Sequence, residues 1–404
     1  MFENLYYQEA GKQLISDYEK GVLPGAILLS GAEYTGKLTA ALELSRVLLC
    51  KESKKGAFDC ECSSCVRVRK LLSPNILLMG AKNSSLEIAA AQNTFVRAVA
   101  EGASYAKQAQ NNFVVAVRKL TMRFNEMLWA KDTNASKIAN LVSSISDSLD
   151  EIDVKTLPEF KKLEKTADAI AKDCAKLESS YMYESLPIAQ VRAVEEWASL
   201  TSDGYKVVIM ESADSMQESV RNALLKTLEE PPANTIFILT TTRKGAILPT
   251  ILSRVRPYTF APRSKEKEQE IVQRVFHTSA ESLALFFQGF LPVKHDVIQE
   301  QAKNFLRAVA NGSFTQNSVI TKNCGGFEPR VLLKYFFNEI ATMLRPLMKT
   351  PVGTSMLSES QNAMREAYLN VTVYNQSPEA ALDIVCRKLW SLNRLHSGVI
   401  ATVL

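Results

Sequence analysis

The sequence lacks any run of about 18 or more apolar residues, the minimum for a membrane-spanning helix. Its N-terminus, MFENLYYQEAGKQL, has no basic segment followed by an apolar one, which a secretion signal would need. His277, His295 and His396 are isolated, and no Ser-His-Asp or Cys-His arrangement is present to support nucleophilic catalysis. We therefore expect a cytoplasmic protein with no membrane partner, whose histidines pack or face solvent.

The composition is that of a globular protein. The chain has 404 residues, 46% of them hydrophobic and 23% charged, which predicts roughly two to four domains with real cores. The formal net charge of +5 is compatible with a nucleic-acid partner but is weak evidence for one.

Strand-like and helix-like segments alternate in two parts of the chain. Short apolar runs indicate strands at GAILLS (25–30), YKVVIMESAD (205–214) and TIFILTTT (235–242). A helix is expected at 217–230, stopped by Pro231 and Pro232. This alternation predicts a parallel sheet covered by helices on both faces. From about residue 265 to the end the pattern is helical.

Residues 81–183 differ from the rest because glycine and proline almost disappear, leaving Gly102 and Pro158. Apolar residues recur there at alternating steps of three and four, which is typical of packed helices. The stripes are Phe113, Val117, Leu120, Phe124 and Met127; Ile138, Val142, Ile145, Leu149 and Ile152; and Phe160, Leu163, Ala167, Ile170, Cys174 and Leu177. We expect an inserted three-helix hairpin or bundle, with turns near Asn134 and Pro158, whose stripes only pack against each other; a partner-docking arm is the alternative.

The stretch GAEYTGKLT (31–39) fits a phosphate-binding loop up to its lysine. Gly31 and Gly36 would let the backbone wrap around phosphates, between a strand and a helix whose amides point at them. Leu38 stands where a Ser or Thr should hold magnesium, and Thr39 lies about 100° further round the helix. The alternative is an ordinary strand-turn-helix with a surface lysine at Lys37.

A cysteine cluster is the second candidate site. Four of the seven cysteines, Cys50, Cys60, Cys62 and Cys65, fall within sixteen positions, and four thiolates can enclose a tetrahedral zinc. Clustering of this kind in a cytoplasmic chain favours a structural metal over disulfides or four free thiols.

Several long segments resemble the bacterial clamp loader, the AAA+ complex that loads the sliding clamp for DNA polymerase III. The segments are FENLYYQEAGKQLISDYEKGVLPGAILLSG, LPIAQVRAVEEWASLTSDGYKVVIM (186–210), NALLKTLEEPP (222–232), FILTTT (237–242) and LPTILSRV (248–255). The resemblance covers about 1–80 and 184–262. It implies an AAA+ (RecA-like P-loop) α/β fold, and it implies a zinc module at about 50–65. The family normally has two residues between its second and third module cysteines, whereas this chain has only Glu61.

The resemblance also allows the ATPase residues to be checked in turn. Lys37 matches the loop lysine, but Leu38 replaces the magnesium hydroxyl. Glu211 stands where the metal-binding Asp would be, and Ser212 replaces the catalytic Glu. The sensor arginine expected after a Gly-Ser pair is missing from NGSFTQNS (311–318). These departures predict a degenerate nucleotide site (Gly31, Gly36, Lys37, Thr39 and Glu211), with weak or absent ATP and magnesium binding and little or no ATP hydrolysis.

Arg254 is the catalytic residue that the resemblance retains. Ser253-Arg254-Val255 resembles the family's Ser-Arg-Cys motif, whose arginine acts in trans on the ATP of the neighbouring subunit. The alternative is a surface arginine that caps a helix. A retained finger beside a degenerate site indicates the delta-prime branch of the family rather than the ATP-hydrolysing gamma/tau branch.

The resulting expectation is a subunit of the DNA polymerase III holoenzyme. Its partners would be other clamp-loader subunits in a hetero-oligomeric ring, the sliding clamp and primer-template DNA. The expected domains are an AAA+ domain (1–80 and 184–262), the helical, coiled-coil-like insertion (81–183), a helical lid (263–320) and a helical collar (321–404). A gamma/tau-type ATPase, or an adaptor acting through its insertion, remain alternatives.

Overall fold

The computed structural model describes residues 1–52, 55–80, 84–157, 159–183, 185–201, 204–313, 317–324, 329–372, 374, 376–396 and 398–403. These residues form two compact units, Met1–Phe287 and Gln288–Leu404. The division falls inside the segment expected to be a lid, and Pro158, where a turn was expected, lies outside the described residues.

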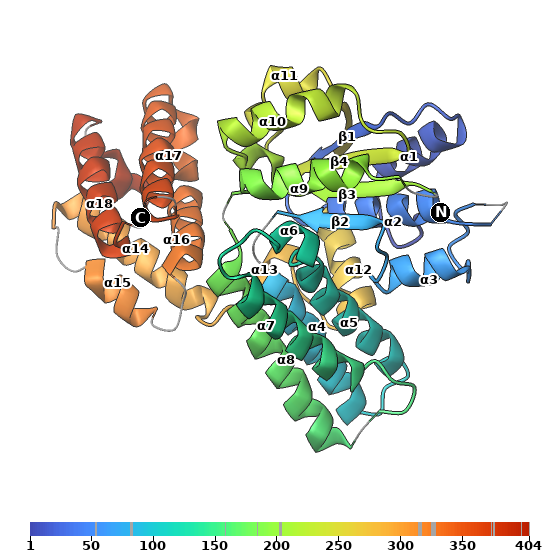
Figure 1. Ribbon diagram of the computed structural model, residues 1–404. Coiled ribbons are helices and arrows are strands. Elements are labelled where there is room, and N and C mark those ends of the chain that lie inside the picture. Colours follow the sequence, from blue (N-terminus) through green and yellow to red (C-terminus); the bar gives the residue numbers. More distant parts are fainter. Residues whose placement is uncertain are drawn as a thin grey trace. The chain divides into compact units, whose positions relative to one another are not determined.

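A parallel five-stranded sheet lies at the centre of the first unit (Figure 1). Its strands are β1 (Ala26–Gly31), β2 (Ile76–Met79), β3 (Lys206–Met210), β4 (Thr235–Thr241) and β5 (Arg256–Phe260), in the order β2-β3-β4-β1-β5. The prediction of a parallel sheet is confirmed, with β1, β3 and β4 at the expected places. The sequence analysis missed β2, which has only four residues, and β5, whose exposed residues interrupt the apolar pattern.

Each face of the sheet packs against its own helices. Ile27, Leu29 and their neighbours pack with helices α1 (Glu9–Glu19) and α2 (Lys37–Leu49). Leu28, Val208 and Phe237 contribute to the core on the other face, with α9 (Ile188–Ser199) and α10 (Glu218–Glu229). Burial on both faces explains why these strands are continuous apolar runs rather than alternating ones.

The segment between β2 and α9 is a helical bundle, but it differs from the predicted one. It contains α4 (Ser84–Ala100), α5 (Ala106–Met122), the short α6 (Glu126–Trp129), α7 (Ala135–Asp150) and α8 (Phe160–Tyr181). Three helices were predicted, and α4, which packs on α5 and α8, was missed. The stripe drawn through Met127 was wrong at that end, because the chain leaves α5 at Arg123 and Met127 is 42% exposed.

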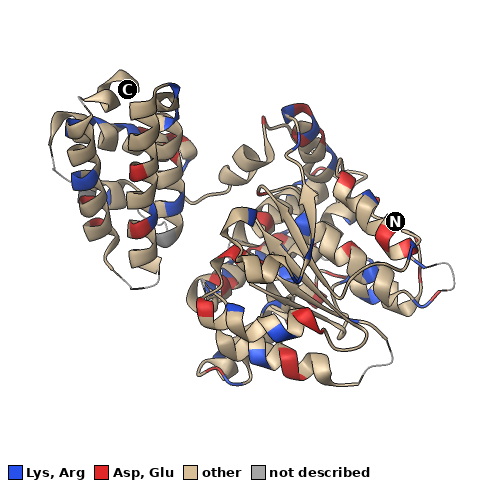
Figure 2. Cartoon of the chain, turned by 90° about the horizontal axis from the view of Figure 1, so that it is seen from above, with Lys and Arg blue, Asp and Glu red and all other residues tan. Residues whose placement is uncertain are grey.

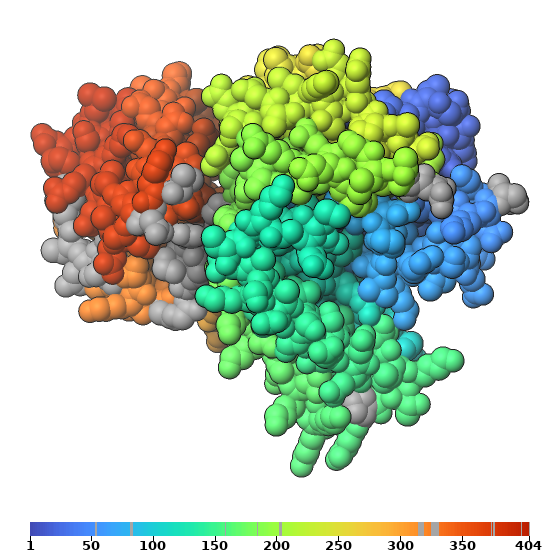
Figure 3. Space-filling model, viewed as in Figure 1, coloured from blue at the N-terminus to red at the C-terminus, as the bar shows by residue number. Residues whose placement is uncertain are grey.

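The bundle also shares its core with the sheet, so the expectation that its stripes pack only against each other was wrong. Phe95 and Phe113 belong to the same buried cluster as Leu77 and Met79 of β2. Figure 3 shows the bundle as a continuous mass that extends from the part of the unit containing the strands. The bundle is therefore part of the folded unit, not a separate arm.

Shorter elements complete the first unit. They are α3 (Ser63–Arg69), α11 (Pro249–Leu252), α12 (Lys265–Phe276) and α13 (Leu283–Gln288), with 3-10 turns η1 (Ala213–Ser215) and η2 (Lys244–Ala246). The bundle is hydrogen-bonded to the end of α12: Arg97 Nη2 donates to the carbonyl oxygens of Phe276 and His277 at 2.8 and 3.1 Å.

The second unit is helical throughout its described part, as the sequence predicted for this region. It contains α14 (His295–Asn311), α15 (Asn317–Asn323), α16 (Pro329–Leu344), η3 (Arg345–Lys349), α17 (Pro351–Thr372), α18 (Pro378–Leu395) and η4 (Val399–Val403). Phe305 and Phe336 meet edge to face in its core, with ring centroids 5.5 Å apart. Within the described ranges, no helix has both the length and the apolar character to cross a membrane.

Candidate functional site

The phosphate-binding loop lies where the sequence predicted it, between β1 and α2. Gly36 immediately precedes α2 with a φ of 89°, a conformation that favours glycine. Gly31 is required for a different reason: a Cβ there would lie 2.4 Å from the carbonyl oxygen of Phe260 on β5. The strand-loop-helix context of the motif is thereby confirmed.

Lys37 is folded back onto its own loop. Its Nζ donates to the carbonyl oxygens of Gly31 and Ala32 at 2.7 and 2.5 Å, and to Thr35 Oγ1 at 3.3 Å. Burial lowers the pKa of Lys37, while the carboxylates of Glu33, Glu211 and Asp214 act in the opposite direction. The ammonium thus binds loop oxygens, although the acidic end of β3 is close enough to influence it.

Leu38 and Thr39 follow at the start of α2. The Leu38 side chain packs against the core formed by β1 and α2. That position is therefore used for packing and offers no oxygen to a magnesium ion. Thr39 is half-buried on the next position of the helix.

An arginine that no sequence motif indicated holds the phosphate-binding loop by hydrogen bonds. Arg263, between β5 and α12, donates to the carbonyl oxygens of Tyr6, Tyr34 and Thr35 at distances of 2.5 to 3.1 Å. The Tyr34 ring stacks on Phe287 of α13 with centroids 5.1 Å apart. Burial lowers the pKa of Arg263, opposed by the charge of Glu268. The loop, the N-terminal segment and α13 are thus joined by the chain's own side chains.

The acidic end of β3 is also occupied. Glu211 Oε2 accepts an ion-paired hydrogen bond from Arg123 Nη2, and these side chains are 15% and 5% exposed. Ser212 follows with a left-handed φ of 54°. Asp214 accepts from Thr241 Oγ1 at 2.7 Å and from Arg243 Nε at 2.9 Å. The magnesium that a P-loop fold implies does not fit these residues, because the loop offers leucine and the carboxylate has an arginine partner.

Arg254 lies at the end of α11 on the surface of the unit. Its Nε and Nη2 both donate to Glu229 Oε2, at 2.9 and 2.7 Å, and its Nη1 donates to the carbonyl oxygen of Thr250 at 2.9 Å. The Arg254 side chain is 28% exposed and that of Glu229 is 58% exposed. The guanidinium is therefore held along one edge while the pair stays open to solvent.

The four clustered cysteines come together as predicted. Cys50 follows α2, Cys60 and Cys62 lie in the next loop, and Cys65 is on α3. Their sulfur atoms all lie within 4.8 Å of one another, with Cys50 and Cys60 Sγ 3.7 Å apart. Zinc bound at about 2.3 Å from each sulfur requires separations near 3.8 Å, so the cluster fits a tetrahedral ion. The single spacer at Glu61 does not prevent this arrangement.

Backbone amides favour one thiolate in the cluster. Burial by itself raises the pKa of Cys62, but hydrogen bonds from the backbone of Lys51 and Cys65, and from neighbouring thiols, bring it down to about 6. Cys62 also caps α3, accepting from the Cys65 amide at 3.4 Å. Because its pKa is lowered, the Cys62 thiol is readily deprotonated, and the thiolate is the form that binds a metal ion.

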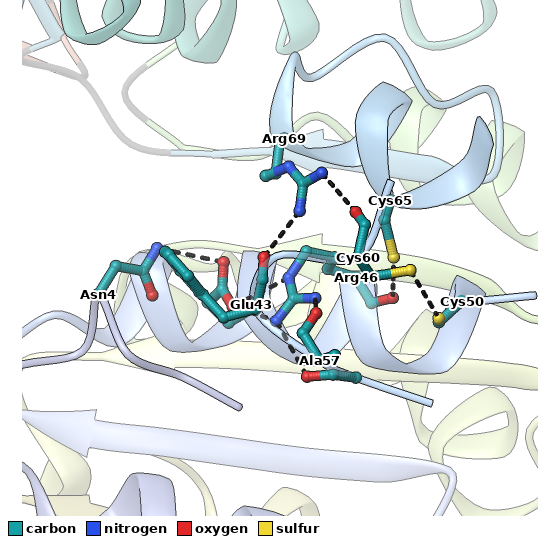
Figure 4. Close-up of polar contacts among 10 residues, drawn as sticks. Asn4, Glu43, Arg46, Cys50, Ala57, Cys60, Cys65 and Arg69 are labelled. Carbon is teal, nitrogen blue, oxygen red and sulfur yellow. Dashed lines mark hydrogen bonds and ion pairs between the residues drawn. The ribbon is translucent and has the colours of Figure 1, made fainter. Parts of the chain in front are cut away.

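Two arginines hold the loop that carries the cluster (Figure 4). Arg46 is fully buried, pairs with Glu43 at 2.9 Å and donates to the carbonyl oxygen of Ala57 at 2.7 Å. Arg69 donates to the carbonyl oxygens of Phe58 and Cys60. Sequence analysis missed both, although a basic residue one turn before the first cysteine is the available signal.

The remaining candidates add little. His295 Nε2 lies 2.8 Å from Glu339 Oε1, and His277 stacks on Tyr105. The segment 311–318, where a sensor arginine was sought, includes 314–316, which lie outside the described residues.

The parallel sheet, its strand order and the glycine loop between β1 and α2 define a P-loop-type α/β protein, as in AAA+ clamp-loader subunits. The family model described as DNA polymerase III, delta subunit, matches residues 6–264. Because this match covers more than half of the chain, the protein belongs to that family. The match includes the sheet, the bundle and the cysteine cluster, and stops short of the second unit.

Individual relatives match over shorter stretches. The DNA polymerase III subunit delta' of Haemophilus influenzae is 33% identical over 130 residues, 30% of this chain and 39% of the relative. That of Escherichia coli is 48% identical over 59 residues, 15% of this chain and 18% of the relative. The gamma/tau subunit of Mycobacterium bovis is 46% identical over 56 residues, 14% and 10% of the two chains. The chain thus spans about two fifths or less of these relatives' length.

A solved structure, a DNA polymerase III gamma subunit-related protein of Thermotoga maritima, aligns over 94% of this chain and 98% of its own. The TM-score is 0.38 and the sequence identity 12%, too distant a likeness to support an argument.

Proposed function

We propose that this chain is a non-hydrolysing clamp-loader subunit of the DNA polymerase III holoenzyme, of the delta-prime type. The observation that carries this proposal is the state of the nucleotide site. Glu211 is paired with Arg123, Lys37 is bound to its own loop, and Leu38 packs against the core. A site with these contacts lacks a free carboxylate and a hydroxyl for magnesium, and Ser212 cannot activate water as a carboxylate would.

Arg254 supplies the chemistry that remains. Lent to a neighbouring ATPase subunit, its guanidinium would stabilise the charge that develops on the γ-phosphate. Glu229 and the carbonyl oxygen of Thr250 hold one side of the Arg254 guanidinium. The side chain therefore has fewer conformations to lose when the neighbouring subunit binds. Its partial exposure supports a role at a contact between subunits.

The other parts of the chain have structural roles in this proposal. The cysteine cluster holds zinc, whose binding energy would fix the loop between α2 and β2. Residues 263–320 act as a lid and 321–404 as a collar that joins the ring of loader subunits in the cytoplasm. The sliding clamp and primer-template DNA are the further partners, the DNA being met through phosphate contacts. Figure 2 shows basic and acidic positions interspersed over the first unit.

A gamma/tau-type ATPase is the second candidate, favoured by the retained lysine and by the similarity to gamma/tau subunits. Purified full-length chain should show no magnesium-dependent ATP turnover, and reconstitution with loader subunits should restore clamp loading. Turnover by the chain alone that Lys37→Ala abolishes would instead establish the ATPase candidate.

A further inference from the structure

The bundle places one of its arginines at the metal-binding end of the nucleotide site. Arg123 is the residue that ends α5. Its Nε donates to the carbonyl oxygen of Gly80 at 3.0 Å, and its Nη2 forms the ion pair with Glu211. The Arg123 side chain is 5% exposed and that of Glu211 15%, so the pair is largely shielded from salt and water. The insertion and the sheet thus meet at the carboxylate that would otherwise face a metal ion.

Arg123 is held in place by its own surroundings. Its carbonyl oxygen accepts from the indole N–H of Trp129 at 2.7 Å, and Phe124 stacks on Trp129 with centroids 5.0 Å apart. Its Nη1 donates to the carbonyl oxygen of Lys119 one turn earlier. Because these contacts fix both the backbone and the guanidinium, the Arg123 side chain is held in one orientation.

The ends of β2 and β3 beside the Arg123–Glu211 pair are also closely packed. The Glu211 amide donates to the carbonyl oxygen of Met79 at 2.9 Å, which joins β3 to the end of β2. Gly80 has a φ of 86°, and a Cβ there would lie 2.5 Å from the carbonyl oxygen of Glu211. The backbone of Glu211 therefore has little room to shift and carry the carboxylate away from Arg123.

We propose that the helical insertion acts as a built-in plug, in which Arg123 takes the place of magnesium at Glu211 and closes the nucleotide site to divalent cations. This inference deepens the proposed function, because it gives a cause for the inactivity of that site and a role for residues 84–181. A divalent ion beside Glu211 would be repelled by the guanidinium, and the repulsion is strong at a buried position. The plug thus locks the bundle to the sheet without a nucleotide.

The test compares magnesium responses of full-length variants. Arg123→Met removes the charge and keeps an unbranched apolar stem, leaving Glu211 free to bind a cation. Thermal unfolding is measured in magnesium chloride and in sodium chloride of matched ionic strength. We expect no specific response from the wild type, and about a tenfold gain in the folding equilibrium of Arg123→Met at magnesium near ten times its Kd. Equal responses of the two proteins would overturn the proposal.

Arg118→Met is the matched control. Arg118 also lies on α5, is 9% exposed and pairs with the nearly buried Asp153 at 3.2 Å, but it does not touch Glu211. This variant should lose stability without gaining a magnesium response; a response equal to that of Arg123→Met would count against a specific site. Arg123→Met/Glu211→Gln should also show none, because the negative charge that would attract the cation is gone.

If Arg123→Met does not fold, Arg123→Gln removes the charge but keeps an amide N–H that can donate to the carbonyl oxygen of Gly80 in place of the guanidinium. It should show a magnesium response of the same sign, and its absence would refute the plug. ATP turnover by the wild-type chain is read separately. Turnover would disprove the proposed function, whereas the magnesium responses of the variants decide the plug.

Discussion

The cysteine cluster and the phosphate-binding loop lie in the same unit, and both were predicted from short motifs. At the cluster the four sulfur atoms converge within 4.8 Å, at separations that suit one ion. At the loop the groups that should meet a ligand already meet the chain itself: Lys37 binds loop carbonyls, and Glu211 binds Arg123. The comparison teaches that a motif predicts the assembly of a site, while its availability depends on residues far away in the sequence.

Two arginine–glutamate pairs show the same contrast. The Arg123–Glu211 pair is almost buried, so breaking it would leave an uncompensated charge in the interior. The Arg254–Glu229 pair is open to solvent, and pairs of that kind contribute little to stability. A weak, exposed pair can exchange partners, which a finger acting on another subunit needs, whereas the buried pair is suited to a permanent lock.

The largest effect should come from breaking the cysteine cluster. Cys65→Ser replaces a fully buried sulfur, and we expect loss of bound zinc and destabilisation of up to about 10 kcal/mol, the scale of structural zinc sites. Metal analysis and thermal unfolding of the purified protein measure both. Equal metal content in variant and wild type would mean that the cysteine cluster does not bind the zinc.

Cys174→Ala is the control for that experiment. Cys174 is buried on α8, outside the cluster, so it should keep full zinc content and cost about 1–2 kcal/mol through the lost packing. A parallel loss of zinc would mean that the first variant acted through general unfolding.

A smaller but more specific effect is expected at Arg254. Arg254→Ala should lower ATP turnover of the reconstituted loader at least about tenfold, because the charge on the neighbour's γ-phosphate loses its partner. Assembly, followed by gel filtration, should be unchanged, since the pair with Glu229 is exposed. Arg256→Ala is the matched control: Arg256 is 46% exposed on β5 and pairs with Asp17. If both variants reduce turnover equally, Arg254 is no finger.

The sequence predicted features set by local pattern. The parallel strands β1, β3 and β4, the loop at Gly31–Lys37 and the cysteine ligands follow from residues close together in the chain. Features that depend on distant contacts were missed. Neither Arg123 nor Arg263 belongs to a motif, and each acquires its role only when α5 or β5 is placed beside the sheet. Helix α4 escaped detection because alanines fill much of its buried face, which weakens the apolar pattern.

The smallest predicted effect concerns Lys37 and sharpens the contrast between the two sites. Burial lowers the pKa of Lys37 below its ordinary value of 10.5 in the folded state. Between the lowered pKa and the ordinary value, the unfolded chain binds more protons than the folded one, so this group makes stability rise with pH. Lys37→Met should therefore weaken the dependence of the unfolding free energy on pH in the alkaline range, by an amount equivalent to less than one bound proton per molecule. Urea unfolding at several alkaline pH values measures this dependence. A dependence equal to that of the wild type would mean that burial does not act on the Lys37 ammonium, and the loop would then be open to a ligand.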